Sequence, residues 1–352
     1  MPLEALSRVS LCRGLGAGAS ARLLALARER RWAAGERLVR QNEPARGAVI
    51  IAEGEVALQV ALPGGQALEV GRLAAGDIFG EMALLEAGRC SASAVAVGAV
   101  RGWFLGRDEF RALVATREPE ALELQRALMR DLLAKLRALN GRALAHAAPE
   151  DRPARRALPA ADPLAGVARR ERADFDLEAF LPRLPFFSGF DAEEVAALAA
   201  EARLLELPHG AWLFVQGQPA EACFLVVRGA VEVLARARDR ERRVAIAGPG
   251  ELVGHLALLE GCAHGASACM REAGWLLEWP RATFLRRCDG ADALALRLVR
   301  AVQASLLRAL ARTNTLLVRL IAHAQLTAAH TEAAALAAEL YGQGWQAEPA
   351  RS

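Results

Sequence analysis

The stretch that decides the fold occurs twice in this chain, as GDIFGEMALLE at residues 76–86 and as GELVGHLALLE at residues 250–260. Each copy has glycines at its first and fifth positions, and each ends in Ala-Leu-Leu-Glu. Other landmarks also match: residues 35–42 with 210–217, Gly54 with Gly229, and Phe110 with Phe284. The offset between the copies is 175 residues before the motif and 174 from the motif onward, so one deletion accounts for the difference between two whole domains. The chain therefore contains an internal repeat.

Short runs rich in Val, Ile, Leu and Phe and bounded by glycines predict the same strands in both copies. They lie at 48–52, 55–62 and 94–105, and at 211–215, 223–227, 230–235 and 274–279. Several short strands at this spacing are typical of a β-sandwich or barrel. Helical spacing precedes the strands at 19–30 and at 191–202, where Asp191 is a candidate N-cap. We expect an α+β fold of two tandem jelly-roll-like β-barrels with flanking helices.

Each copy ends in a long helix with an apolar face, expected at about 118–144 and about 291–323. Leu132, Leu136 and Leu139 in the first and Val302 and Leu306 in the second follow a and d spacing. One such face can pack on its own barrel, and a face this wide can also serve a helix-to-helix interface. We expect a homodimer or a protein partner to bind through these closing helices.

Composition changes divide the chain into four parts. We expect a first domain at 1–146, a linker rich in Pro, Ala and Arg at 147–175, a second domain at 176–325, and a C-terminal tail at 326–352. Within the tail, residues 331–341 have the pattern of one more short helix, which Gly342 ends.

The composition excludes several classes of protein. Hydrophobic residues make up 53% of the 352 residues and charged residues 24%, which suits a globular chain. A net charge of +3 argues against a strongly basic nucleic-acid-binding protein. Arg, Glu or Asp interrupts every long apolar run, so we expect no membrane helix and no signal peptide. The six cysteines include no Cys-x-x-Cys pair, which suits buried thiols in a reducing compartment, and we expect a cytoplasmic protein. The basic residues are almost all Arg, with Lys135 the only Lys, as expected of a GC-rich bacterial genome.

Catalytic and metal-binding signatures are absent from the sequence. There is no Gly-x-Ser-x-Gly, no phosphate loop and no catalytic Cys-His signature. Cys262, His264 and Cys269 have a spacing that matches no zinc knuckle, and the His-x-His plus Glu of cupin enzymes is missing. We therefore expect neither an enzyme nor a bound cofactor.

At FGEMALL, residues 79–85, the repeat resembles a known family. Both copies are similar to the cyclic-nucleotide-binding domain shared by bacterial catabolite-activator-type regulators and by kinase regulatory subunits, over about 6–144 and 180–323. The resemblance implies a phosphate-binding cassette, a short helix whose first amides face the cyclic phosphate. It also implies a Glu that accepts a hydrogen bond from the ribose 2′-hydroxyl, an Arg nine residues later that pairs with the phosphate, and a small residue after it.

Carried over residue by residue, the resemblance assigns roles in the first copy and implies cyclic AMP or cyclic GMP as its ligand. Gly80 and Ala83 match the amide positions, Glu81 matches the ribose acceptor, and Met82 lies between them. Ser91 and Ala92 match the small pair that begins the next strand.

The Arg of the family pattern is displaced in the first copy. Cys90 stands at its position and Arg89 one residue earlier. A slip of one residue at a strand edge turns a side chain to the opposite face, so Arg89 is either a surface residue or reaches the phosphate through a bulged loop. In the second copy His255 replaces the Glu and His264 the Arg. Neutral His cannot replace the carboxylate acceptor and the guanidinium fork together, so we expect a pseudo-site. The alternative is a different anionic ligand held by protonated histidines.

These patterns favour a non-enzymatic sensor or regulatory protein that binds its ligand, if any, in the first domain. One alternative is a transcriptional regulator of the catabolite-activator superfamily that acts through a partner. A helix-turn-helix needs roughly 60–70 residues and about 29 follow residue 323, so we expect no direct DNA binding. The other alternative is a structural dimer that acts without a ligand.

Overall fold

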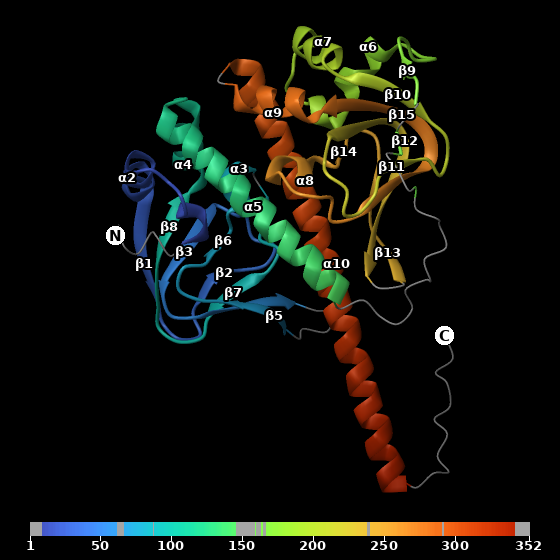
Figure 1. Ribbon diagram of the computed structural model, residues 1–352. Helices are drawn as coiled ribbons and strands as arrows, with labels where there is room; N and C mark the ends of the chain where they lie inside the picture. The colour runs from blue at the N-terminus through green and yellow to red at the C-terminus, as the bar shows by residue number, and fades with distance from the viewer. Residues whose placement is uncertain are drawn as a thin grey trace.

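The computed structural model describes residues 9–61, 67–86, 88–145, 159, 163–164, 167–237, 240–290 and 292–341. Two β-rolls lie beside a pair of long helices, α5 (Pro119–Ala145) and α10 (Ala293–Tyr341), that cross each other between them (Figure 1). The predicted α+β class and tandem arrangement are confirmed.

The first roll consists of two four-stranded sheets, with strand orders β1-β8-β3-β6 and β2-β7-β4-β5. Its elements are η1 (Ser10–Cys12), α2 (Ala17–Leu26), β1 (Ala27–Trp32), β2 (Arg37–Val39), β3 (Gly47–Glu53), β4 (Val56–Ala61), β5 (Ala67–Leu73), β6 (Ile78–Phe79), α3 (Met82–Leu85), β7 (Ser93–Ala96), β8 (Val100–Gly106) and α4 (Arg107–Ala115). The helix predicted at 19–30 is too long, because residues 27–32 pair with β8 as a strand. Tertiary pairing here overrides a local helical pattern.

The second roll repeats this plan with longer strands, in a sheet of order β13-β12-β15-β10-β9, with β11 on β15 and β14 on β12. Its elements are β9 (Arg169–Arg170), α6 (Leu177–Phe180), η2 (Leu181–Arg183), η3 (Pro185–Phe187), α7 (Ala192–Ala200), β10 (Arg203–Leu207), β11 (Trp212–Phe214), β12 (Ala222–Ala237), β13 (Arg240–Ala247), β14 (Leu252–Val253), α8 (His255–Glu260), β15 (Ser267–Pro280) and α9 (Arg281–Asp289). Asp191 caps α7 as predicted, in a capping box with Glu194.

The backbone hydrogen bonds repeat at the offset read from the sequence. The amide of Gly76 donates to Ile51 O at 2.9 Å, and the amide of Gly250 donates to Val226 O at 2.8 Å. At the other end of the roll, the Gly35 amide donates a hydrogen bond to the Ala96 carbonyl, and the Gly210 amide donates to the Met270 carbonyl in the same way. The glycine pattern therefore reflects one backbone path traced twice.

The two closing helices bury matching faces at a constant offset of 174 residues. The buried pairs are Leu124 and Leu298, Leu128 and Val302, Leu132 and Leu306, and Leu136 and Leu310, all within one apolar core that continues into both rolls. Across the contact between α5 and α10, Gln125 Nε2 donates to Gln303 Oε1 at 3.4 Å, and Thr313 Oγ1 donates to Asn140 Oδ1 at 3.0 Å. Each helix thus packs both on its own roll and on the other helix of the same chain. The expected homodimer through these helices stays a prediction.

Two segments differ from the expected domain plan. Residues 169–170, placed in the linker, pair as β9 with β10, so the end of that segment belongs to the second roll; most of 147–166 lies outside the described residues. The helix α10 runs without a break to Tyr341, since no Gly or Pro interrupts residues 324–330, so residues 326–341 continue the closing helix. Within the described residues, no helix combines the length and apolarity needed to cross a membrane.

Candidate functional site

The first cassette begins at a turn that requires glycine. β6 ends at Phe79, and Gly80 follows with φ +76°. A Cβ at Gly80 would lie 2.7 Å from the Gly47 carbonyl oxygen, so a larger residue has neither the conformation nor the space. The chain then enters α3, where the Ala83 amide donates to the Gly80 carbonyl at 2.9 Å. Ala83 is buried, and Met82 is partly buried against the apolar core that contains the closing helices.

The loop after α3 settles which residue of the first copy corresponds to His264. The Cys90 amide donates to Glu43 O at 2.9 Å, and its carbonyl accepts from Asn42 N at 2.9 Å. His264 makes the same two bonds, to Gln218 and from Gly217, at 2.9 and 2.8 Å. Cys90 therefore occupies the position that the resemblance gives to the phosphate-pairing Arg.

Arg89 lies one residue before that position and is exposed. Its backbone bridges to Pro44, and its Nη1 donates to the Asn42 carbonyl at 2.6 Å. The Cys90 side chain is half-buried, and burial together with the Glu43 carboxylate raises the pKa of its thiol. In this geometry a carbonyl holds the guanidinium at the surface, and a neutral thiol stands where the resemblance implies a cation. Ser91 and Ala92 follow as the exposed and half-buried residues that lead into β7.

Glu81, the predicted ribose acceptor, is buried and paired with the closing helix. Its Oε2 lies 3.0 Å from Lys135 Nζ on α5. The same Nζ lies 3.2 Å from Asp131 Oδ2 and donates to the Ile78 carbonyl at 2.9 Å. An ammonium has three protons, and these three acceptors can use all of them. Burial by itself lowers the pKa of Lys135, but the two carboxylates outweigh it and raise the pKa above its ordinary value.

The second cassette has the same backbone with different side chains. Gly254 has φ +83° and precedes α8, as Gly80 precedes α3. His255 is buried, with no hydrogen-bond partner for either ring nitrogen in the described part of the chain. Burial, helped by the charge of Arg308, lowers the pKa of His255 to about 4, and burial lowers that of His264 to about 4. Both rings are therefore neutral near pH 7, which argues against an anion held by protonated histidines.

Aromatic rings fill the interior of the second roll at its cassette. The His264 ring stacks on Phe214 with centroids 3.8 Å apart and planes 10° apart, and Phe214 stacks in turn on Phe224. At the matching positions the first roll has smaller side chains. The pairs are Cys90 for His264, Val39 for Phe214 and Ala96 for Met270. Val39 is half-buried, whereas Phe214 is buried. At the position of Val253 the first roll has the larger Phe79, so the two rolls place their aromatic rings at different positions.

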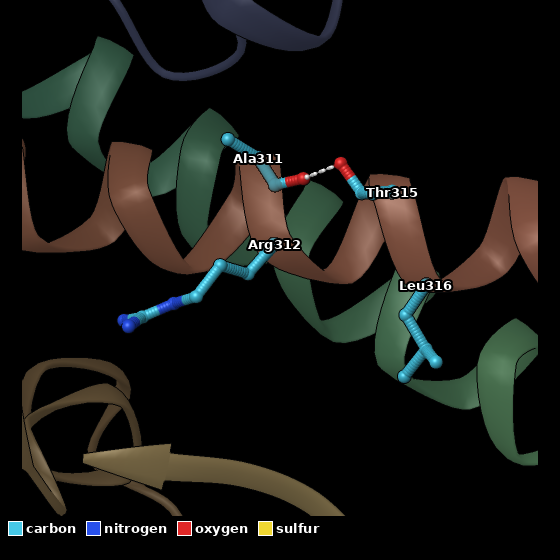
Figure 2. A pocket seen from close by; sticks show the side chains of 4 residues that line it. All are labelled: Ala311, Arg312, Thr315 and Leu316. Atoms are coloured by element: carbon cyan, nitrogen blue, oxygen red, sulfur yellow. Dashed lines mark hydrogen bonds between the residues drawn. The ribbon is translucent and has the colours of Figure 1, made fainter.

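Two hollows in the described structure lie away from the cassettes. One of about 530 Å³ beside β10 contains Arg228 and the ion pair of Arg170 with Glu206, whose charged groups are 3.0 Å apart. The other, of about 400 Å³ on α10, is lined by Ala311, Arg312, Thr315 and Leu316 (Figure 2). In it Arg312 extends towards the second roll, where it pairs with Glu251, and the Thr315 hydroxyl donates to the Ala311 carbonyl. Among the described residues, no three His, Cys, Asp or Glu side chains gather as a metal site.

Two segments of the chain match the family described as "Cyclic nucleotide-binding domain", residues 29–117 and 204–290, which together make up half of its length. The chain belongs to the cyclic nucleotide-binding domain family. Each matched segment contains one roll with its cassette, so the chain has two cyclic nucleotide-binding domains.

Several known proteins are similar to part of this chain or to most of it. A "CRP-like cAMP-activated global transcriptional regulator" of Mycobacterium tuberculosis is 28% identical over 85 residues, 24% of this chain and 38% of that protein. A "Cyclic AMP receptor protein" of Thermus thermophilus is 34% identical over 102 residues, 29% of this chain and 47% of that protein. The chain thus spans less than half of either relative. The regulatory domain of Toxoplasma gondii PKA, solved with cAMP, is 20% identical with a TM-score of 0.30, over 82% of this chain and 91% of that one.

Sequence reasoning missed the partners of Glu81. Lys135 and Asp131 are one helical turn apart on α5, but they look like an ordinary exposed i,i+4 pair. The available signal was that the only Lys of an Arg-rich chain stands beside apolar positions of a closing helix.

Proposed function

We propose that this chain is a non-enzymatic regulatory protein whose first cyclic nucleotide-binding domain is its ligand site and whose second is a structural pseudo-site. The proposed ligand is cyclic AMP or cyclic GMP. The observation that carries the proposal is the filling of the second cassette by the stacked rings of His264 and Phe214. The first cassette has Cys90 and Val39 at those positions, and it keeps Gly80 and Glu81.

The charges around the first cassette oppose tight binding of an anion. Glu81 and Asp131 carry two negative charges against the one positive charge of Lys135, and Arg89 is bonded to a carbonyl at the surface. The Ala83 and Leu84 amides at the start of α3 already donate to the Gly80 and Glu81 carbonyls, so they can offer a phosphate only shared, neutral hydrogen bonds. A charge-assisted Arg fork is stronger than such neutral bonds, so its loss lowers the affinity for cyclic nucleotides.

A ligand-independent structural role is the second candidate, and one observation favours it. Lys135 already satisfies one Glu81 oxygen, so the first cassette is stable without a ribose hydroxyl. In that case the two domains serve as a scaffold whose closing helices pair within the chain. Regulation of transcription through a partner protein would fit either candidate.

Calorimetric titration of the whole chain tests the proposal. The ligands are cyclic AMP, cyclic GMP and cyclic dinucleotides, with adenosine and guanosine as controls that lack the phosphate. We expect weak binding of one cyclic nucleotide per chain and loss of the heat signal in Glu81→Ala. Two sites per chain, or full affinity in Glu81→Ala, would contradict the proposal, and no binding of any ligand would support the structural role.

A further inference from the structure

The buried charge cluster around Lys135 exists in only one of the two copies. At the offset of 174 residues, the counterparts of Glu81, Asp131 and Lys135 are His255, Ser305 and Ala309. The counterparts lie in a similar environment, because His255 and Ser305 are buried, as Glu81 and Asp131 are, and Ala309 is partly buried. All three charges are replaced together, and the second roll folds with the same backbone bonds. The fold itself therefore does not require this cluster, and its presence in the copy that keeps Glu81 needs another reason.

The same helix also contacts the second cassette. Two residues after Lys135, Arg137 Nη2 lies 2.7 Å from Glu260 Oε2 and 2.6 Å from Cys262 Sγ. Glu260 is the last residue of α8, the counterpart of α3. The last turns of α5 therefore bond to both cassettes, to the first through Lys135 and to the second through Arg137.

We propose that Lys135 is a positioning residue for Glu81, and that α5 carries the state of the first cassette to α8 through Arg137. The proposal rests on the proposed function, because it makes the second domain the reader of ligand binding in the first. A ribose hydroxyl that donates to Glu81 shares the carboxylate with Lys135, which weakens one of the three contacts of the ammonium. The ammonium then moves towards Asp131 and Ile78, and the turn of α5 that bears Arg137 moves with it.

The first part of the test uses the single lysine as a probe. Protein labelled with [15N]lysine gives one side-chain Nζ signal, because Lys135 is the only Lys in the chain. We expect Glu81→Gln to shift this signal, since it removes a charge 3.0 Å away. Glu86→Gln is the matched control, because Glu86 is an exposed carboxylate at the other end of α3. An unchanged signal in Glu81→Gln would show that Lys135 does not position Glu81.

The second part measures hydrogen exchange of the α8 amides in the full chain without ligand. An exposed ion pair such as Arg137–Glu260 contributes a fraction of a kcal/mol to about one, so its loss should raise exchange by roughly 1.5- to 5-fold. We expect this rise in Glu81→Gln and in Lys135→Met, near wild-type exchange in Lys135→Arg, and none in Glu86→Gln. The β10 amides report any loss of global stability, and the comparison uses the α8 amides that exchange faster than β10, through local opening.

An Arg137→Met background distinguishes a transmitted effect from general loosening. If α5 acts through Arg137, Lys135→Met should change α8 exchange no further in that background. Unchanged α8 exchange in Glu81→Gln and Lys135→Met, or an equal rise in β10, would overturn the proposal even if the protein binds cyclic nucleotide. The predicted rise would support it even if titration finds no ligand, so the failure of this link and that of the proposed function are distinguishable.

Discussion

Replacing Cys90 by Arg should strengthen cyclic-nucleotide binding, because it restores a guanidinium at the matched position of the first cassette. The backbone there is held by the two bonds to Glu43 and Asn42, so the new side chain starts from an ordered site. A hydrogen bond to a charged group contributes about 1.5–3 kcal/mol. Against this stand the ordering of a long side chain, which costs up to about 2 kcal/mol, and competition from the Glu43 carboxylate beside Cys90. We expect a net gain of about 1–2 kcal/mol, which is roughly a 5- to 30-fold lower dissociation constant.

The assay is calorimetric titration of Cys90→Arg, Cys90→Ala and Arg89→Ala with cyclic AMP and cyclic GMP. Cys90→Ala removes the thiol without adding charge and should bind like the native chain. Arg89→Ala should also change little, because Arg89 is bonded to a surface carbonyl. Abolished binding in Arg89→Ala together with no gain in Cys90→Arg would refute the reasoning, since Arg89 would then be the phosphate partner. Tight native binding that none of the variants alters would place the ligand outside this cassette.

The remaining predictions concern binding, stability, pH and DNA. Glu81→Ala should weaken nucleotide binding by about 1.5–3 kcal/mol, and His255→Ala should leave it unchanged; titration compares the two. Lys135→Met should lower the free energy of unfolding by about 3 kcal/mol in denaturant melts, because two buried carboxylates lose their cation, and adding Glu81→Gln with Asp131→Asn should recover most of it. His255 and His264 have depressed pKa values of about 4, so unfolding binds protons between pH 6.5 and 4. Stability should therefore fall as pH drops through that window, on the order of 2 kcal/mol per histidine at pH 5, and constant stability there in pH-dependent melts would contradict the burial of these rings. The chain by itself should leave no footprint on duplex DNA at about 200 mM salt, and a footprint that persists would oppose the sensor proposal.

The repeat was readable from the sequence because it depends on local backbone requirements. Gly80 and Gly254 both have positive φ, and at such positions a side chain with a Cβ is strained, so the glycines mark the turns at matching places. The apolar runs at 48–52 and 55–62 match β3 and β4, and Asp191 marks the start of a helix. The run at 94–105 covers two strands, β7 and β8, and no run predicted β10 or β13. Where local pattern and tertiary pairing disagreed, at Ala27–Trp32, the pairing with β8 decided.

The candidate site was only partly readable. The register of the loop could be predicted. Cys90 stands at the position of His264, as the spacing predicts, and the matching backbone hydrogen bonds agree. The direction of the Arg89 side chain could not be predicted, because a long side chain beside a turn can reach several acceptors. In the structure it donates to the Asn42 carbonyl. The neutral state of His255 and His264 was also invisible, since it depends on burial by segments distant in the sequence.

The sequence alone determined the number of domains, their fold, their cassettes and the loss of the second ligand pattern, because each of these depends on residue types at fixed spacings along the chain. The tertiary structure alone decided what each cassette side chain contacts. Glu81 and Lys135 are 54 positions apart in the chain, and Arg137 and Glu260 are 123 apart, yet each pair lies within ion-pair distance. Such contacts depend on how α5 packs between the rolls, and no local pattern records that packing.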